Sequence, residues 1–427
     1  MAVGVSHTDN EIDHLITTFE DDNALPSNKD SLDIIYSNKT DSKLITKKTK
    51  TNFVDINKTP SKLKDNSILL CDNYYGIHEL INEQKKPKLI YLDPPYATGM
   101  SFISREQEYA YKDDMSNAQY LEYMRRRIIL MREALDDDGS IYIHIGHQMV
   151  AHMKILMDQI FGESNFKNII TRRKCSSKNY TKNQYANIHD YILFYTKSKN
   201  YVWNQPGETP DKEWINKEYN KEDSNGRYKL VPIHAPGTRN GSTGGEWNGM
   251  LPPKGKHWQY TPDKLTELNN NGFIHWSKTG NPRRKVYLTK DKKISLSDYW
   301  LNYRDAHHQS IKITGYPTEK NLDMLKMIVR ASSNQDDLVL DPFCGSGTTL
   351  HAARDENRKW IGMDKSIQAI KTSLIRMNEG MDIMGDYVNE KQKNMKQASL
   401  FQENNKATIL IDSQSKNIDE IIRKLTK

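Results

Sequence analysis

The sequence predicts an α/β fold in which a parallel sheet carries helices on both faces. From about residue 66, short apolar segments alternate with amphipathic segments of helical length. Apolar segments of about four to six residues are typical of buried strands, and their alternation with helices is typical of a parallel sheet. Two of these segments end in distinctive loops, Asp93-Pro94-Pro95-Tyr96 and Asp341-Pro342-Phe343-Cys344-Gly345-Ser346-Gly347. Sheets of this kind bind ligands at the carboxyl ends of their strands.

The first half of the predicted sheet lies between residues 66 and 171. The expected strands are Ser67–Leu70, Lys88–Leu92, Ser140–Ile145 and Ile169–Thr171. Between them we expect three helices, Tyr74–Asn82, Ser116 to Gly139 and Met149–Phe161. Ser116 and Gln119 have the spacing of a capping box, and Gly139 is typical of a helix end. The pattern therefore predicts strand and helix in strict alternation.

The second half of the predicted sheet follows residue 310. We expect strands at Val339–Asp341 and Trp360–Asp364, and a helix from Glu319 to Ala331 with one apolar face. Thr318 precedes that helix and is a plausible N-cap, which alone would explain a threonine there. After Asp386 the chain becomes rich in lysine and glutamine, and then a strand at Ala407–Asp412 and a helix at Ile418–Leu425 are expected. These last elements can dock on the body or on another subunit.

Composition restricts the class of protein. The 427 residues carry a formal net charge of +7 and a pI near 8.9, which fits a polyanionic partner without proving one. The sequence has neither a long apolar run nor a signal peptide at its start, so we expect a cytoplasmic protein without membrane contact. The cysteines, Cys71, Cys175 and Cys344, are too scattered for a disulfide framework. His144 and His147 are interpreted as structural, and no metal site is expected.

The residues Asp93 to Tyr96 have the chemistry needed to hold an amine on a nucleobase. Asp93 and the Pro94 carbonyl can each accept a hydrogen bond from the amine, and the two prolines stiffen the loop because they fix φ. The Tyr96 ring can stack on a base that has left the duplex, which returns about 1–3 kcal/mol of lost stacking. The alternative is an ordinary turn after a strand.

The glycine loop after Asp341 predicts a nucleotide-like cofactor. Gly345 and Gly347 allow a ligand to approach the backbone, and Asp364 ends the next strand roughly 20 residues later, where Rossmann-type folds bind a ribose diol. No Walker lysine follows Gly347, so a nucleoside cofactor is favoured over a triphosphate. Asp72, at the end of another strand, can reach the cofactor's adenine or cap the following helix, and the sequence favours neither role.

The segment from about Arg172 to His308 is rich in tryptophan, glycine and basic residues, and we interpret it as an insert that contacts DNA. Its candidate contacts are Arg172, Arg173, Lys174, Arg239, Arg283 and Arg284. The alternative is a small β-rich domain with a tryptophan core and lysines that face solvent. We expect the tryptophans to be mostly core and some arginines to be functional.

These motifs resemble the β group of amino-methyltransferases of DNA, over roughly residues 66 to 390. The resemblance rests on Asp93–Phe102, Tyr316–Lys320, Asp341–Gly347 and the insert segments Leu251–Trp258 and Ile274–Pro282. Asn321 and Ala97 depart from the family pattern, which usually has proline and asparagine there. The resemblance implies a circularly permuted, Rossmann-like methyltransferase sheet that uses S-adenosylmethionine and carries an inserted target-recognition domain. It implies that Asp341, Phe343, Gly345 and Gly347 form the methionine-binding loop and that Asp364 binds the ribose. The matching segment before the helix makes Thr318 and Lys320 candidate cofactor-binding residues, and Asp72 is a further candidate from its place in the sheet.

The order of the motifs then divides the chain into five parts. They are a polar, partly ordered arm (1–50), a catalytic half (51–171), the target-recognition insert (172–310), a cofactor-binding half (311–390) and a tail (391–427). Since Asp93 resembles adenine-modifying members, whereas serine is more usual in cytosine-N4 enzymes, the resemblance implies an adenine-N6 methyltransferase that acts on a specific double-stranded DNA sequence. It is expected in a restriction-modification or epigenetic system, with a homodimer and a cognate restriction endonuclease left open.

Three alternatives to the adenine assignment remain at this stage. One is a cytosine-N4 methyltransferase, because the two exocyclic amines are chemically alike. Another is a methyltransferase of RNA or small molecules, which would have little use for the long insert. The last is a DNA-binding subunit that has lost catalysis, although both motifs retain their characteristic residues.

Overall fold

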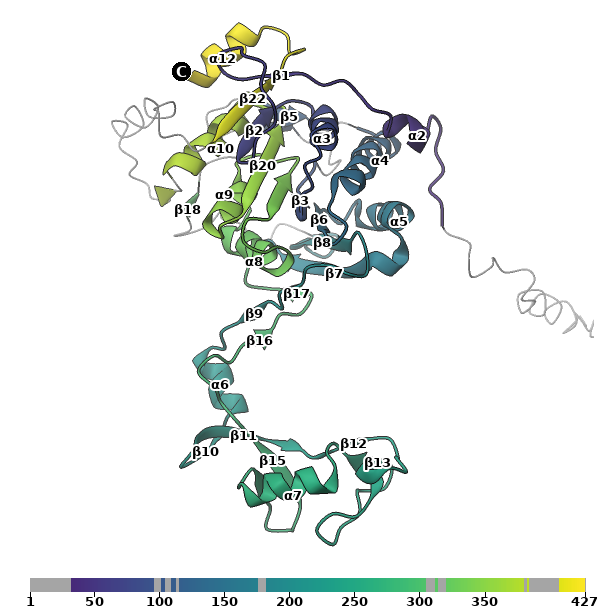
Figure 1. The fold of residues 1–427 in the computed structure, drawn as a ribbon, viewed down its shortest axis with the longest axis vertical. Coiled ribbons are helices and arrows are strands. Elements are labelled where there is room, and N and C mark those ends of the chain that lie inside the picture. Colours follow the sequence, from purple (N-terminus) through teal and green to yellow (C-terminus); the bar gives the residue numbers. More distant parts are fainter. Residues whose placement is uncertain are drawn as a thin grey trace, which may run out of the picture. The chain divides into compact units, whose positions relative to one another are not determined.

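The computed structural model describes residues 32–95, 101–103, 109–112, 115–175, 182–304, 312–313, 320–379, 382–383 and 407–426. The chain divides into two compact units, shown in Figure 1. Unit 1 is formed by Met1–Asn204 with Ser297–Lys427, and unit 2 is formed by Gln205–Leu296.

Unit 1 is built on one ten-stranded sheet. Its strands, in spatial order, are β1 (Phe53–Val54), β22 (Thr408–Asp412), β2 (Ser67–Leu70), β20 (Lys359–Asp364), β19 (Leu338–Asp341), β3 (Leu89–Leu92), β6 (Ser140–Ile145), β8 (His189–Thr196), β7 (Phe166–Arg173) and β17 (Tyr299–Trp300). The six strands from β22 to β6 are parallel, while β8 runs antiparallel to its neighbours β6 and β7. The predicted α/β sheet is therefore confirmed, with antiparallel additions near its edges.

Helices cover both faces of this sheet. One layer contains α3 (Asn73–Asn82), α4 (Asn117–Ala134) and α5 (Val150–Phe161), and the other contains α8 (Leu322–Ser332), α9 (Thr348–Asp355) and α10 (Ile367–Glu379). Ile141 and Ile143 pack into the core with the first layer, whereas Tyr142 between them bonds to Ser332 of α8 at 2.7 Å. Because alternate side chains of a strand point to opposite faces, the two layers lie on opposite sides.

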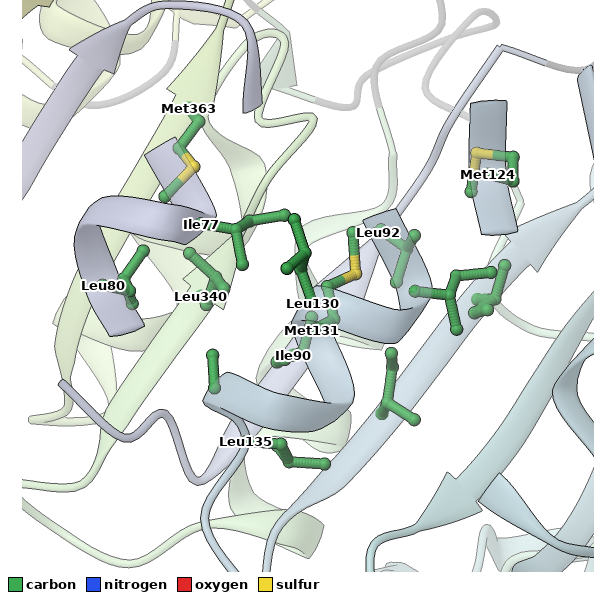
Figure 2. Close-up of a cluster of buried hydrophobic side chains, with 14 of the residues drawn as sticks. Ile77, Leu80, Ile90, Leu92, Met124, Leu130, Met131, Leu135, Leu340 and Met363 are labelled. Atoms are coloured by element: carbon green, nitrogen blue, oxygen red, sulfur yellow. The ribbon is translucent and has the colours of Figure 1, made fainter. Parts of the chain in front are cut away.

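The core beneath the first helical layer is continuous across the sheet. Figure 2 shows apolar side chains of strands and helices interdigitated there, including Ile77, Leu80, Ile90, Leu92, Met124, Leu130, Met131, Leu135, Leu340 and Met363. All of these side chains are buried. A strand that is buried on both faces reads as an uninterrupted apolar run, which explains why the sequence pattern located these strands within a residue or two.

The helix ends mostly agree with the predicted ones. Ser116 and Gln119 form the expected capping box at the start of α4. The helix expected from Glu319 begins instead at Leu322, because the Asn321 side chain accepts a hydrogen bond from the Met324 N–H at 3.0 Å and acts as the N-cap. The assignment of the N-cap to Thr318 was therefore wrong, and Thr318 itself lies outside the described residues.

Both terminal regions contribute to unit 1. In the N-terminal region, Ile45 of α2 (Ser42–Ile45) is buried in the core, and the Arg125 guanidinium donates to the Thr40 carbonyl at 2.7 Å. In the C-terminal region, β22 pairs with β2, and α12 (Ile418–Thr426) packs against α10. Residues 408–426 thus dock on the body of this chain, which decides between the two alternatives left by the sequence.

Unit 2 is a small α/β body of its own. It contains a four-stranded sheet of β10 (Lys221–Asp223), β11 (Gly226–Pro232), β15 (Pro282–Tyr287) and β14 (Ile274–Trp276), the pair β12 (His234–Pro236) and β13 (Lys256–Trp258), and the helices α6 (Lys212–Glu218) and α7 (Pro262–Asn270). Trp247 and Trp258 are buried in its core, and Trp276 packs against them. These tryptophans are core residues, as expected.

The limits of unit 2 differ from those expected for the insert. Residues 172–204 and 297–304, which the sequence pattern assigns to the insert, belong to unit 1. The physical reason is that β7 and β8 extend the main sheet beyond β6, and β17 returns the chain to the edge of the same sheet. The change of composition near residue 172 therefore falls within a strand of the sheet and does not mark its end.

Candidate active site

A row of aspartates lies along one edge of the parallel sheet. Asp341, Asp364 and Asp412 are the last residues of β19, β20 and β22, while Asp93 directly follows β3 and Asp72 follows β2 by two residues. These five strands are neighbours in the order β22, β2, β20, β19, β3. Since they are parallel, all five carboxyl ends meet at the edge where such sheets bind ligands.

Asp93 lies at one end of this row. Pro94 is buried and Pro95 is partly buried, so the loop after Asp93 is held in place as it leaves the sheet. The Asp93 carboxylate forms an ion pair with Lys320, at 2.7 Å from Oδ2 to Nζ. Only 18% of the Asp93 side chain and 11% of the Lys320 side chain are exposed. Tyr96 lies outside the described residues.

The glycine loop occupies the centre of the row. Gly345 and Gly347 have φ angles of 48° and 73°, in the left-handed region that favours glycine. A Cβ on Gly347 would lie 2.7 Å from the Ser373 hydroxyl oxygen, so this position has no room for a side chain. The Gly345 N–H donates to Asp364 Oδ2 at 3.0 Å, which ties the loop to the next strand. Glycine is thus required both by the backbone conformation and by the lack of space.

The two central carboxyls are in an unusual electrostatic position. Asp341 is 3% exposed, and burial raises its pKa to about 7, while hydrogen bonds from Thr349 and the Phe343 N–H act in the opposite direction. Burial also raises the pKa of Asp364, against the hydrogen bonds from the Ser366 and Gly345 N–H groups. Within the described part of the chain, no lysine or arginine forms an ion pair with either carboxyl. Both are suited to a ligand that brings positive charge or hydroxyl groups.

Asp72 has a structural role in this conformation. Its Oδ1 accepts from the Tyr74 N–H at 2.9 Å, which makes it the N-cap of α3. The same carboxylate pairs with Arg127 and with Lys365, both at 2.7 Å. Burial raises the pKa of Asp72, but these two cations outweigh burial and hold the pKa below its ordinary value. The capping role is confirmed; contact with a cofactor's adenine stays a prediction.

Arg127 of α4 links Asp72 to the glycine loop and was missed by the sequence analysis. Its Nε donates to Asn73 Oδ1 at 2.5 Å, and Asn73 Nδ2 in turn donates to the Pro342 carbonyl at 2.7 Å. The guanidinium lies 3.4 Å from the centre of the Tyr123 ring, which in turn lies 6.4 Å from the Phe343 ring. Arg127 interrupts the apolar stripe of the helix α4, and this position was the feature of the sequence that indicated a buried arginine.

A buried polar network extends from Tyr91 of β3 to β7. The Tyr91 hydroxyl lies 2.7 Å from His144 Nδ1, and His144 Nε2 lies 2.9 Å from Asp190 Oδ2. Arg172 completes the network, with Nη1 3.0 Å from the same oxygen and Nε donating to the Tyr303 carbonyl at 2.7 Å. His144 is structural, as expected. Our assignment of Arg172 to DNA was wrong, because its side chain is 0% exposed and its guanidinium is engaged inside the protein.

The other candidate DNA contacts are at least partly accessible. Arg239 and Arg283 of unit 2 are exposed, and Arg284 is partly exposed, with its guanidinium 5.4 Å from the centre of the Tyr260 ring. Arg173 and Lys174 of unit 1 are also partly exposed. Unit 2 contains sixteen lysines and arginines against ten aspartates and glutamates, which is +6 of the chain's net +7. The excess positive charge is therefore concentrated in this unit.

Among the described residues, no cluster of metal-ligating side chains is present, and no helix is long and apolar enough to cross a membrane.

Known proteins with similarity to this chain include DNA methyltransferases. A family model described as DNA methylase matches residues 87–375. The Type II methyltransferase M.EcaI of Enterobacter cloacae is 60% identical over 370 residues, which cover 86% of this chain and 82% of that protein. The Type II methyltransferase M.KpnI of Klebsiella pneumoniae is 30% identical over 358 residues, covering 74% and 85%. A crystal structure of the M1.HpyAVI–SAM complex aligns with a TM-score of 0.40 and 17% identity, covering 73% of this chain and 98% of that one.

Proposed function

The chain belongs to the N6/N4 family of DNA methylases, and from that premise we propose that it methylates the N6 amine of adenine within a specific DNA sequence. Its methyl donor is S-adenosylmethionine, which supplies an activated methyl group on a sulfonium. The choice of adenine over cytosine, and the assignment of individual residues to each step, are our inferences from the site.

The observation that carries the proposal is the adjacency of Asp93 and the glycine loop. Leu340 of β19 lies opposite Ile90 of β3 in parallel register. Asp341 therefore lies opposite Tyr91, and Asp93 lies two residues further along the neighbouring strand. A donor held at Asp341 and an amine held at Asp93 would be neighbours at one edge of the sheet. Holding the two reactants in this orientation supplies much of the rate in a displacement reaction.

The central carboxyls and the glycine loop fit the cofactor. Asp341 is a buried carboxyl without an ion-pair partner among the described residues, so the cofactor's ammonium group would supply the missing positive charge. Gly345 and Gly347 carry no side chain, so a ligand can approach the backbone of this loop, while Ser373 occupies the place that a Cβ of Gly347 would take. Asp364 would hold the ribose hydroxyls while it keeps its bond from the Gly345 N–H. Thr318 is proposed for the same site from the family resemblance.

Asp93 and the prolines after it would hold the target base. The Asp93 carboxylate and the Pro94 carbonyl would each accept one hydrogen of the amine, which draws the nitrogen lone pair out of conjugation with the ring. Tyr96 would stack on the flipped base. An aspartate in the first position of this motif favours adenine over cytosine, because the resembling cytosine-N4 enzymes more usually carry serine there.

Nucleoside mass spectrometry tests the choice of base. The chain is expressed in cells that lack their own amino-methyltransferases, and their DNA is digested and analysed. We expect N6-methyladenine, and we expect none from an Asp93→Ala variant. N4-methylcytosine as the sole product would overturn the adenine assignment while leaving the family membership intact.

We also propose that unit 2 reads the DNA. Its net charge of +6 fits the phosphate backbone, and its exposed Arg239 and Arg283 are the strongest candidates, followed by Arg284. Arg173 and Lys174 of unit 1 are further candidates for DNA contact. Replacing a phosphate contact with methionine should weaken binding to all sequences alike and reduce its salt dependence. An unchanged salt dependence after Arg283→Met would remove that residue from the interface.

We propose two protein partners for this chain. Since M.EcaI and M.KpnI are named as Type II methyltransferases, we propose that this chain acts in a restriction-modification system with a cognate endonuclease. We expect that the product of a neighbouring gene cleaves host DNA and that expression of this chain blocks the cleavage. If expression of this chain protects DNA from no endonuclease, the proposal of such a partner is wrong. A homodimer is the second proposed partner, and a monomeric mass by sedimentation would exclude it.

A further inference from the structure

Lys320 connects the two halves of the catalytic unit. It lies just before α8, in the segment that leads to the cofactor loop, yet its ammonium group contacts Asp93 in the other half at 2.7 Å. Both side chains are largely withdrawn from solvent. The family resemblance assigned Lys320 to the cofactor, whereas the structure places it on the aspartate that would hold the target amine.

The surroundings of Lys320 explain why a cation is stable there. Burial by itself raises the pKa of Asp190, but His144, Arg172 and Lys320 together hold that pKa below its ordinary value. Lys320 is thus close enough to interact with both Asp93 and Asp190. The two carboxylates, Asp93 and Asp190, are therefore balanced by two cations, Arg172 and Lys320. Removing one cation would leave a buried negative charge unbalanced.

The buried network also lies close to Asp93. Besides burial, the charge of Asp93 is among the causes that raise the pKa of Tyr91, so the carboxylate and the Tyr91 hydroxyl are near each other. Burial holds the pKa of Tyr91 well above its ordinary value, and its hydroxyl therefore keeps the proton that it shares with His144. Asp93 is therefore close to the Tyr91–His144 pair and forms an ion pair with the Lys320 ammonium.

We propose that Lys320 is a positioning residue that orients Asp93 for the target amine. The inference rests on the proposed function, because it requires that Asp93 receives the base. A carboxylate can accept about four hydrogen bonds, so the contact of Lys320 with Oδ2 is compatible with a bond from the amine. An ion pair fixes the rotamer of a short side chain, and a displacement of about 1 Å in a catalytic group can lower the rate 100-fold.

The test uses single substitutions in the full chain. Lys320→Met removes the charge and keeps most of the side-chain volume, while Lys320→Arg keeps the charge. Lys326→Met is the matched control, because Lys326 of α8 forms a comparable ion pair with Asp355 at 2.7 Å, outside the aspartate row. Turnover is measured with radiolabelled S-adenosylmethionine on unmethylated bacterial DNA, and cofactor affinity is measured by calorimetry.

We expect Lys320→Met to lower kcat about 100-fold and to change the Kd for the cofactor and the KM for DNA by less than about threefold. Lys320→Arg should recover at least a tenth of the wild-type kcat, and Lys326→Met should retain all of it. Thermal unfolding of each variant shows whether a loss of activity comes from misfolding. If Lys320→Met does not fold, Lys320→Gln provides a second variant without the charge.

Three outcomes would overturn the inference. A wild-type kcat in Lys320→Met would show that Asp93 needs no such partner. If Lys320→Met lowers cofactor affinity as much as it lowers kcat, Lys320 is a cofactor-binding residue, as the resemblance implies. A wild-type protein that methylates no DNA would overturn the proposed function itself, and the inference with it, so the two failures are distinguishable.

Discussion

Replacing Asp341 with asparagine should make the free protein more stable and the cofactor bind less tightly. Asp341 is 3% exposed and lies at the end of β19 without a cation bound to it among the described residues. Asparagine has nearly the same shape and keeps the oxygen that accepts the Phe343 N–H at 3.0 Å. The substitution removes the free-energy cost of ionising a buried carboxyl group.

The magnitude follows from the pKa. Burial raises the pKa of Asp341 from 3.8 to about 7, so the folded state holds its proton where the unfolded state has lost it. Stability contributed by this group is therefore unaffected below about pH 4, falls as the pH rises from about 4 to 7, and stays low above 7. Each pKa unit corresponds to about 1.4 kcal/mol, which gives an upper limit of about 4 kcal/mol at pH 8. Between pH 5 and pH 8 the advantage of Asp341→Asn should grow by about 2–3 kcal/mol.

Melting temperatures at several pH values test this prediction. An advantage of that size should raise the melting temperature of Asp341→Asn over wild type by roughly 5 °C more at pH 8 than at pH 5. Asp72→Asn is the control with the opposite sign, because Arg127 and Lys365 hold the pKa of Asp72 below its ordinary value and the variant should be destabilised at pH 8. Calorimetry should show cofactor affinity reduced about 10- to 100-fold in Asp341→Asn, the loss of one charged hydrogen bond. An advantage independent of pH, or unchanged affinity, would refute the reasoning.

Other substitutions separate the parts of the site. Tyr96→Ala should lower turnover while leaving cofactor binding largely intact, and Asp341→Ala should lose cofactor binding first; equal loss of binding in both would contradict two separate sites. Gly347→Ala should weaken cofactor binding at least tenfold and lower stability by about 1–3 kcal/mol, because the new Cβ meets Ser373 and the backbone is left-handed; calorimetry and thermal unfolding measure the two effects. Arg172→Met should destabilise the protein by about 3–5 kcal/mol in denaturant unfolding, because it removes the guanidinium from the buried Asp190 carboxylate, whereas Arg283→Met should change stability by less than about 0.5 kcal/mol. Similar effects of the two arginine variants would contradict the distinction between a structural and a surface arginine.

The sequence predicted the site well where single strands determine it. Each predicted strand is present, although Ile169–Thr171 lies in β7, which pairs antiparallel with β8 and is partly exposed. The strands of the parallel part were predictable because a strand buried on both faces requires an unbroken apolar run. Asp93, Asp341 and Asp364 follow such runs directly, so their common edge was predictable once the strands were taken as parallel. The glycine loop was equally predictable from the sequence, since few residues other than glycine adopt a left-handed backbone.

Contacts between distant segments were not predictable in the same way. Lys320 and Asp93 are separated by the whole of unit 2 in the sequence, and no local pattern indicates that they meet. Asp412 joins the aspartate row only because β22 inserts beside β2, which depends on the pairing of a strand with an exposed sheet edge. Arg172 looked like a surface residue beside Arg173 and Lys174, but alternation along β7 turns it inward to Asp190. In each case the role of the residue depends on a neighbour that is distant in the sequence and close only in the folded structure.

A crystal structure of the full chain with S-adenosylmethionine would test the central claim most directly. The account predicts that the cofactor lies along the aspartate row, with its ammonium group within hydrogen-bond distance of Asp341, its ribose hydroxyls on Asp364 and its methyl group directed toward Asp93. The Lys320 ion pair with Asp93 should remain in place. A cofactor bound away from the glycine loop, or with its methyl group turned away from Asp93, would contradict the account.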